Sequence, residues 1–235
     1  MKKVCKITAI VLAAGQGSRM NSSVAKQYLE LEGKPLVYYS LKAFEESRVD
    51  DIILVTGKGQ IEYCKNQIVE LYHFNKIRQV IEGGKERYDS VYGALQCLKN
   101  TDYVLIHDGA RPFITVEMIN NMIAMVREHS ACILATPVKE TVKVADTSHT
   151  ILSTPDRHSL WSAQTPQAFH YQSIRIAYDK FFDHKDNIEV TITDDSMVYE
   201  LFLKMPVKIV AGDYRNIKIT TPEDMIIAKA LMNGN

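Results

Sequence analysis

The sequence predicts an α/β fold with a doubly wound, mostly parallel sheet and a projecting β-hairpin arm. Short apolar runs alternate with helix-period segments along most of the chain, which is the pattern of βαβ units. A glycine-rich turn follows the first apolar run directly, at residues 12–20. The alternation breaks once, after Pro137, where the sequence has the character of a hairpin.

Strands and helices alternate through the first 136 residues. The apolar runs predicted as strands are 7–12, 52–56, 79–81, 103–106 and 132–136. The helical faces between them are Leu36, Tyr39, Leu41 and Phe44, with Pro35 just inside the helix start; Ile61, Cys64, Ile68 and Leu71; Val91, Ala94, Leu95 and Leu98; and Met118, Met122 and Met125. We expect the methionines to belong to the core rather than to a ligand-binding patch. Such a sheet is Rossmann-like.

The second part of the chain begins with the predicted arm, at about residues 138–160. Two short β-type runs, 141–144 and 151–154, flank a polar segment in the way a hairpin requires. An identical subunit is the simplest partner for such a projection. Beyond the arm we predict helices near 174–181 and 194–203, a strand at 207–210, and a last helix capped by Thr221 with Pro222 at its first position.

Composition limits the class of protein. The 235 residues are 46% hydrophobic and 24% charged, so we predict a single globular domain over residues 1–235. Basic and acidic residues balance at 28 each, and no general attraction to nucleic acid or membranes is expected. Lys6 and Thr8 interrupt the first apolar run, which argues against a signal peptide or a membrane span. Four dispersed cysteines in apolar segments indicate reduced thiols and a cytoplasmic location.

The glycine-rich turn at residues 12–20 is the strongest local signal. Its glycines let the backbone approach a phosphate closely, and Arg19 and Lys26 add positive charge, so a triphosphate would suit it. A dinucleotide site is disfavoured because Met20 stands where glycine or alanine is wanted. A Walker loop is excluded, because no Gly-Lys-Ser/Thr follows at the required spacing. A plain strand-to-helix turn with solvated cations remains the alternative for this segment alone.

The turn is one of several motifs that occur in a recognisable order. They are Gly15-x-Gly17-x-Arg19-Met20 with Lys26, residues 83–91, residues 107–113, Asp156-Arg157, residues 160–167, Thr193-Asp194-Asp195 and residues 216–220. Together they resemble the 2-C-methyl-D-erythritol 4-phosphate cytidylyltransferase family, within the sugar-nucleotide pyrophosphorylase and cytidylyltransferase superfamily. The resemblance runs from about residue 7 to about residue 232. It departs at Leu12, where many members carry proline, and we expect little consequence because Ala13-Ala14-Gly15 is kept.

The resemblance implies an enzyme that transfers CMP from CTP to 2-C-methyl-D-erythritol 4-phosphate and releases pyrophosphate, in the non-mevalonate route to isoprenoid precursors. It implies catalytic roles for Arg19, Lys26, Arg157 and Lys218. It implies a nucleotide pocket formed by Ala13, Ala14, Gly15, Gly17, Gly84 and Ser90, where a larger side chain at Gly84 should obstruct the base. It implies a sugar-phosphate site formed by Asp108, Gly109, Arg111, Thr141 and Thr193. It also implies a homodimer in which the arm carries Arg157 to the partner's site.

The chemistry of the implied reaction favours positioning over proton transfer. A phosphate monoester, with a second pKa of about 6, is already mostly a dianion at neutral pH, so no general base is required. Fixed cations then dominate, and we expect Mg²⁺ bound mainly through the CTP phosphates, with no protein metal ligand assigned. His107 is therefore expected to be structural rather than a catalytic base. Asp194 and Asp195 fit helix capping as well as metal binding.

Two alternatives to this function stay open. A ribitol 5-phosphate cytidylyltransferase shares the glycine turn and the Thr165-Pro166-Gln167 segment, although Gly109-Ala110 and residues 161–163 look more like the methylerythritol branch. A non-catalytic nucleotide-binding regulator would keep the pocket and lose turnover. The presence together of Arg19, Lys26, Arg157 and Lys218 speaks against a regulator.

Overall fold

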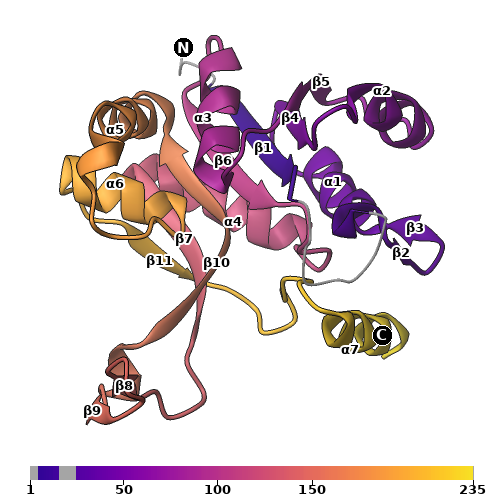
Figure 1. Ribbon diagram of the computed structural model, residues 1–235. Coiled ribbons are helices and arrows are strands. Elements are labelled where there is room, and N and C mark those ends of the chain that lie inside the picture. Colours follow the sequence, from indigo (N-terminus) through magenta and orange to yellow (C-terminus); the bar gives the residue numbers. More distant parts are fainter. Residues whose placement is uncertain (1–4, 16–24, 235) are drawn as a thin grey trace.

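A central sheet organises the computed structural model, which describes residues 5–15 and 25–234 (Figure 1). Within these residues the sheet has seven strands in the order β11-β7-β10-β6-β1-β4-β5. The strands are β1 (Ile7–Ala13), β4 (Asp51–Thr56), β5 (Ile77–Glu82), β6 (Tyr103–Asp108), β7 (Ala131–Pro137), β10 (Trp161–His170) and β11 (Lys208–Ala211). β10 runs antiparallel to β6 and β7, and the other neighbouring pairs are parallel. The predicted α/β class with a mostly parallel sheet is confirmed.

Helices cover both faces of the sheet, because the strands are apolar on both sides. Along β1, Ile7, Ala9 and Val11 belong to one core, whereas Ile10 belongs to the other. The first core is closed by α1 (Leu36–Glu46), α2 (Ile61–Cys64) and α4 (Val116–His129), and the second by α3 (Arg87–Cys97), α5 (Tyr171–His184) and α6 (Asp195–Leu203). Met122 is buried in the first core and Met118 and Met125 pack against it, so the prediction that the methionines are core residues is confirmed.

Two predicted helix details were wrong. α1 begins at Leu36, and Pro35 is its N-cap rather than its first residue. A small hairpin of β2 (Glu30–Leu31) and β3 (Lys34–Pro35) precedes the helix and includes Pro35. The N–H of Leu36 donates to the Leu29 carbonyl at 3.0 Å, next to this hairpin. Leu71, expected on a buried helical face, is 57% exposed. α2 continues into a π-helical segment, η3 (Lys65–Glu70), whose wider turns rotate the following residues away from the 3.6-residue period.

The C-terminal helix α7 (Pro222–Asn233) packs against the β2–β3 hairpin and α1. Leu31, Leu36, Ile219 and Ala228 form a small separate core there. Thr221 caps α7 in a capping box with Asp224, and Pro222 occupies the first turn as predicted. No helix in the described part of the chain is both long and apolar enough to cross a membrane.

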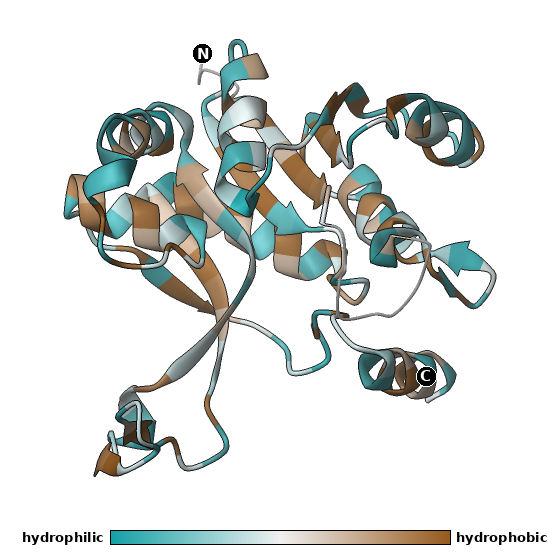
Figure 2. Ribbon diagram, in the orientation of Figure 1, coloured by the Kyte–Doolittle hydropathy of each residue, from teal (hydrophilic) through white to brown (hydrophobic). Residues whose placement is uncertain are grey.

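The arm leaves the sheet between β7 and β10 and extends away from the body of the molecule (Figure 1). It carries β8 (Val144–Ala145), β9 (Ile151–Ser153) and the 3-10 turn η4 (Arg157–Ser159). The hairpin is therefore present, although its paired strands are shorter than the predicted 141–144 and 151–154. Hydrophobic residues lie on this thin extension (Figure 2). Ile151 and Leu152 are 59% and 63% exposed, so the arm has no core of its own.

Candidate active site

A cleft opens at the carboxyl ends of the neighbouring strands β1 and β6. Its volume is about 270 Å³, and its lining comprises Leu12, Ala14, Gly15, Lys26, Gln27, Gly84, Lys85, Glu86, Arg87, Ser90, Asp108, Ala110 and Lys218. A second cavity of about 370 Å³ shares part of this lining and continues past Gly57 and Lys58. Open parallel sheets bind ligands at this edge, because the strands end there and the loops that follow surround a crevice.

The cleft brings together residues that the sequence places in several separate motifs. The predicted site residues in its lining are Ala14, Gly15, Lys26, Gly84, Ser90, Asp108 and Lys218. Ala13, the last residue of β1, is buried beside them. Gly17 and Arg19, also predicted for this site, lie outside the described residues.

Lys26 begins the short helix η2 (Lys26–Tyr28). Two contacts anchor η2. The Gln27 amide nitrogen donates to the Ala13 carbonyl at 2.5 Å, and the Tyr28 hydroxyl lies 3.0 Å from the Cys64 sulfur. A Cβ built on Gly15 would lie 3.8 Å from Cε of Lys26, so the lysine side chain passes close to the glycine backbone. Sequence reasoning missed Gln27, because a buried amide anchor gives no local pattern.

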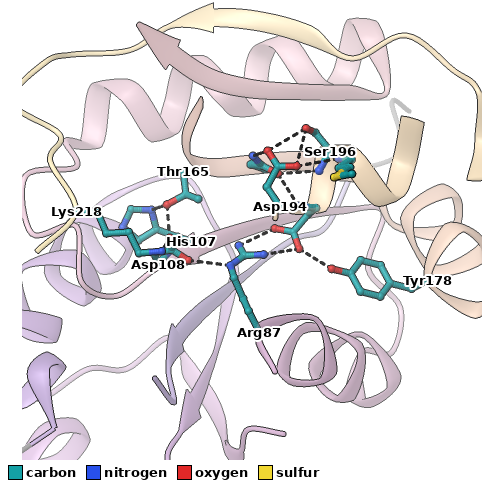
Figure 3. A network of polar contacts seen from close by, with 11 residues as sticks. Arg87, His107, Asp108, Thr165, Tyr178, Asp194, Ser196 and Lys218 are labelled. Atoms are coloured by element: carbon teal, nitrogen blue, oxygen red, sulfur yellow. Dashed lines mark hydrogen bonds and ion pairs between the residues drawn. The ribbon is translucent and has the colours of Figure 1, made fainter. Parts of the chain in front are cut away.

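The Asp108 carboxylate is held between two cations (Figure 3). Lys218 Nζ lies 2.7 Å from its Oδ2, and Arg87 Nε donates to its Oδ1 at 3.1 Å. The backbone N–H of Asp108 donates to the Thr165 hydroxyl at 3.0 Å. Burial alone would raise the pKa of Asp108, but Arg87 and Lys218 outweigh it and hold the pKa well below its usual range. The carboxylate therefore stays ionised at neutral pH.

Arg87 joins Asp108 to a second carboxylate, that of Asp195. Its two terminal nitrogens donate to the two oxygens of Asp195 at 2.9 and 2.8 Å. Asp195 is completely buried, and the Tyr178 hydroxyl also donates to it, at 2.6 Å. Burial lowers the pKa of Arg87, but Asp195 and Asp108 raise it well above its ordinary value. The motif at 83–91 contained Arg87, yet its partner is 108 positions away and could not be identified from local pattern.

Asp194 has a capping role. Its side chain accepts from the backbone N–H of Met197 at 2.9 Å, at the start of α6. The Gln167 amide donates to Asp194 at 2.8 Å and also accepts from the N–H of Asp195, which ties α6 to β10. No group of three or more His, Cys, Asp or Glu side chains that could hold a metal occurs in residues 5–15 and 25–234.

His107 is fully buried behind the cleft. Its Nδ1 lies 3.1 Å from the Thr165 hydroxyl, and its Nε2 lies 3.4 Å from the Arg111 carbonyl. Burial lowers its pKa to about 3, so the ring is neutral at neutral pH. The ring connects β6 with β10, which agrees with the structural interpretation.

The structure gives a reason for Gly84 that differs from the predicted one. A Cβ at this position would overlap Cβ of Asp89 on α3. The close approach of α3 therefore requires glycine here, whether or not a nucleotide base binds nearby. The N–H of Gly84 donates to the Ser90 hydroxyl at 3.0 Å. Gly109 is also tightly enclosed, because a Cβ there would lie 3.0 Å from the Leu12 carbonyl oxygen.

Besides Ala13 and Gly109, four predicted site residues of the described chain are absent from the lining of the cleft. Arg111 lies beneath it, donating to the Asn216 carbonyl at 2.7 Å, with its Nε buried and without a hydrogen-bond partner. Burial lowers the pKa of Arg111. Thr193 is exposed just before α6. Thr141 and Arg157 belong to the arm, where Arg157 donates to the Lys139 carbonyl at 3.0 Å and lines a separate cavity.

Comparisons with known proteins give one consistent result. The sequence model of a family described as 2-C-methyl-D-erythritol 4-phosphate cytidylyltransferase matches residues 7–234. A protein of that name from Lachnoclostridium phytofermentans is 52% identical over 227 residues, which are 97% of this chain and 96% of the relative. Another from Alkaliphilus oremlandii is 45% identical over 234 residues, or 99% of this chain and 97% of the relative.

Solved structures agree with the sequence matches. The crystal structure of 4-diphosphocytidyl-2C-methyl-D-erythritol synthase from Anaerococcus prevotii has a TM-score of 0.85 at 37% identity, covering 97% of this chain and 96% of that one. The 2-C-methyl-D-erythritol 4-phosphate cytidylyltransferase of Francisella tularensis has a TM-score of 0.78 at 29% identity, covering 96% and 99%. On the strength of the full-length sequence match, this chain belongs to the 2-C-methyl-D-erythritol 4-phosphate cytidylyltransferase family.

Proposed function

We propose that this chain transfers CMP from CTP to 2-C-methyl-D-erythritol 4-phosphate and releases pyrophosphate, as a step in isoprenoid precursor synthesis in the cytoplasm. The observation that carries the proposal is the cleft at the ends of β1 and β6, where the Gly15 backbone, Lys26 and Lys218 meet. A phosphate oxygen of the acceptor attacks the α-phosphorus of CTP, and the bond to pyrophosphate breaks. Because the acceptor is already a dianion, the protein only has to hold two polyanions in line.

The two lysines have different proposed partners. Lys26 lies beside Gly15, so we assign it to the triphosphate, where a fixed cation offsets the charge that develops on the reacting phosphorus and on the pyrophosphate. Lys218 is aligned by Asp108, and we assign it to the acceptor phosphate. Arg19 is proposed to act with Lys26.

Mg²⁺ is proposed to arrive with the nucleotide. The described residues offer no cluster of metal-binding side chains, and both oxygens of Asp108 are already engaged by Lys218 and Arg87. The triphosphate oxygens are therefore the proposed ligands, as is usual for this ion. When bound, Mg²⁺ would neutralise part of the triphosphate charge.

A homodimer is the proposed assembly, with the arm as its contact. The arm exposes the apolar side chains of Val142, Val144, Ile151 and Leu152, and Trp161 is exposed at the adjoining start of β10. An exposed apolar group of this kind, on an extension without a core, is typical of a protein interface. Arg157 and Thr141 lie on this arm and away from the cleft of their own chain, so we propose that they complete the partner's acceptor site.

The sequence Gly109-Ala110 favours the methylerythritol acceptor over ribitol 5-phosphate by resemblance, and the packing around Gly109 is consistent with glycine there. The ribitol branch tends to carry bulkier residues at the positions of Gly109 and Ala110. In this fold a Cβ on Gly109 would lie 3.0 Å from the Leu12 carbonyl oxygen and 3.2 Å from a Val37 methyl, so a larger residue would force β1 or α1 to shift.

A pyrophosphate-release assay tests the proposal directly. The purified protein is given CTP, Mg²⁺ and either methylerythritol phosphate or ribitol 5-phosphate, and each reaction is repeated with ATP, GTP and UTP. We expect release with CTP and methylerythritol phosphate and poor use of the other combinations. Equal use of ribitol 5-phosphate or a preference for UTP would contradict the assignment, and binding of CTP without turnover would favour the regulator.

A further inference from the structure

We propose that Arg87 is a positioning residue, which orients Asp108 so that Lys218 directs its ammonium group to the acceptor phosphate. The inference rests on the proposed function, in which Lys218 contacts that phosphate. Arg87 has no assigned role in the reaction, and it lies on α3, a different element from either of the other two residues.

The guanidinium group fixes the carboxylate of Asp108 in one orientation (Figure 3). Arg87 uses Nε for Oδ1 of Asp108 (3.1 Å) and its two terminal nitrogens for Asp195 (2.9 and 2.8 Å). Asp195 is completely buried and also accepts from Tyr178, so the carboxylate that binds the Arg87 guanidinium group is itself fixed in place. With Oδ1 occupied, Oδ2 is the oxygen presented to Lys218, at 2.7 Å. The direction of the lysine thus depends on Arg87 through one carboxylate.

Charge gives a second reason. Arg87 and Lys218 together balance the two carboxylates of Asp108 and Asp195. Without Arg87, this group would carry a net negative charge beside a cleft that must admit two polyanions. Lysine in place of Arg87 keeps the charge, but a single ammonium cannot reproduce a planar fork that reaches two carboxylates at once. The substitution Arg87→Lys therefore separates geometry from charge.

A double-mutant cycle on Arg87→Lys and Lys218→Ala tests the inference in the full-length enzyme. We expect Arg87→Lys to lower kcat/KM for methylerythritol phosphate about tenfold, mainly through KM, because a charged hydrogen bond is misplaced. The KM for CTP should change little. In the Lys218→Ala background, Arg87→Lys should add almost nothing, since the group it positions is gone. Arg175→Lys is the matched control, because Arg175 pairs with Asp179 on α5 at 2.9 Å outside the cleft.

Each outcome decides the inference. Equal losses with and without Lys218, or no loss at all, would overturn it and leave Arg87 as a part of the fold. If Arg87→Lys does not fold, Tyr178→Phe replaces it, since this variant removes only the hydroxyl that steadies Asp195. A smaller rise in acceptor KM that disappears in the Lys218→Ala background supports the inference, and an unchanged acceptor KM overturns it.

A failure of the proposed function can be distinguished from a failure of this inference. A wild-type enzyme that does not release pyrophosphate contradicts the reaction, and the same cycle is then measured as the dissociation constant of methylerythritol phosphate by calorimetry. Coupling between positions 87 and 218 in that binding would uphold the positioning role without the reaction. Independent effects, or no binding by the wild type, would remove it.

Discussion

Lys218 Nζ lies 2.7 Å from Oδ2 of Asp108, and this ion pair ties the segment between β11 and α7 to the end of β6. The segment has no regular secondary structure, so side-chain and backbone contacts position it. Asn216 is completely buried and donates to the Thr165 carbonyl at 3.1 Å, and the N–H of Ile219 donates to the Ala110 carbonyl at 2.8 Å. Lys218 is therefore held from both sides.

Asp108→Asn should damage acceptor use more than nucleotide use. The amide keeps the shape but removes the charge that aligns Lys218 and Arg87, and it leaves two cations without their shared partner. We expect kcat/KM for the acceptor to fall on the order of a hundredfold, with KM for CTP changed little. Steady-state kinetics with each substrate varied in turn measure this. An unchanged kcat/KM for the acceptor would show that the ion pair is not part of the acceptor site.

Lys26→Ala should lower kcat by roughly two to three orders of magnitude, as expected when one preorganised donor is removed from a charged transition state. The melting temperature should stay close to that of the wild type, because the buried contacts of Gln27 and Tyr28 that anchor η2 are unchanged. Lys42→Ala, in an exposed pair with Glu46 on α1, is the control. A Lys26→Ala variant that melts far earlier but keeps its kcat would make the lysine structural.

Much of the sheet could be predicted because β1, β4, β6 and β7 are buried on both faces and therefore read as continuous apolar runs. β10 could not. Polar residues and Pro166 interrupt its sequence, which ordinarily argues against an inner strand. β10 nevertheless forms an inner strand. Its register against β7 shifts between Ala163 and Gln167, so the proline lies where the ladder of hydrogen bonds is already interrupted.

As with the sheet, only part of the candidate site could be identified from the sequence. Motifs placed Lys26, Gly84, Asp108 and Lys218 in one list, and the structure gathers them around one cleft. The Arg87–Asp195 pair was missed, because contacts over 108 positions depend on how α3 and α6 pack and not on any local spacing. The roles of Arg157 and Thr141 remain predictions, since they require a second chain.

His107 should make stability depend on pH without affecting catalysis. Its folded pKa of about 3 lies below the value of about 6.5 in an unfolded chain. Between these values the unfolded state binds a proton that the folded state does not, so the contribution is complete above about pH 6.5 and is lost as pH falls toward 3.

The measurement is denaturant unfolding of the wild type and of His107→Gln at several pH values from about 7 to 4. The free energy of unfolding of the wild type should fall more steeply, by up to about 1.4 kcal/mol per pH unit. Carboxylates titrate in both proteins, so the difference isolates the histidine. Parallel curves would mean that the ring is accessible to protons in the folded state.

Leu152→Asp should separate the proposed dimer. Leu152 is 63% exposed on β9, and a carboxylate there would have to be desolvated in an apolar contact, at a cost of several kcal/mol. Sedimentation equilibrium should show monomers at concentrations where the wild type is dimeric. Ile226→Asp, at a 70% exposed position on α7, is the matched control and should leave the mass unchanged. Dimers of undiminished stability in Leu152→Asp would place the interface elsewhere.

Mixing two inactive variants should restore activity if the arm completes the partner's site. In a Lys26→Ala chain paired with an Arg157→Ala chain, one site carries both defects and the other carries neither, because Lys26 lines the cleft of its own chain and Arg157 lies on the arm. With random assortment about half of the dimers are mixed, so about a quarter of all sites should be intact.

The experiment is co-refolding of the two variants, confirmation of mixed dimers by mass, and a pyrophosphate-release assay. Each variant refolded alone should stay near background. Mixing either variant with Leu152→Asp monomers controls for effects of refolding itself, since those chains should not pair. If confirmed mixed dimers are no more active than the single variants, Arg157 serves the cleft of its own chain or none, because restoration depends on the arginine crossing between subunits.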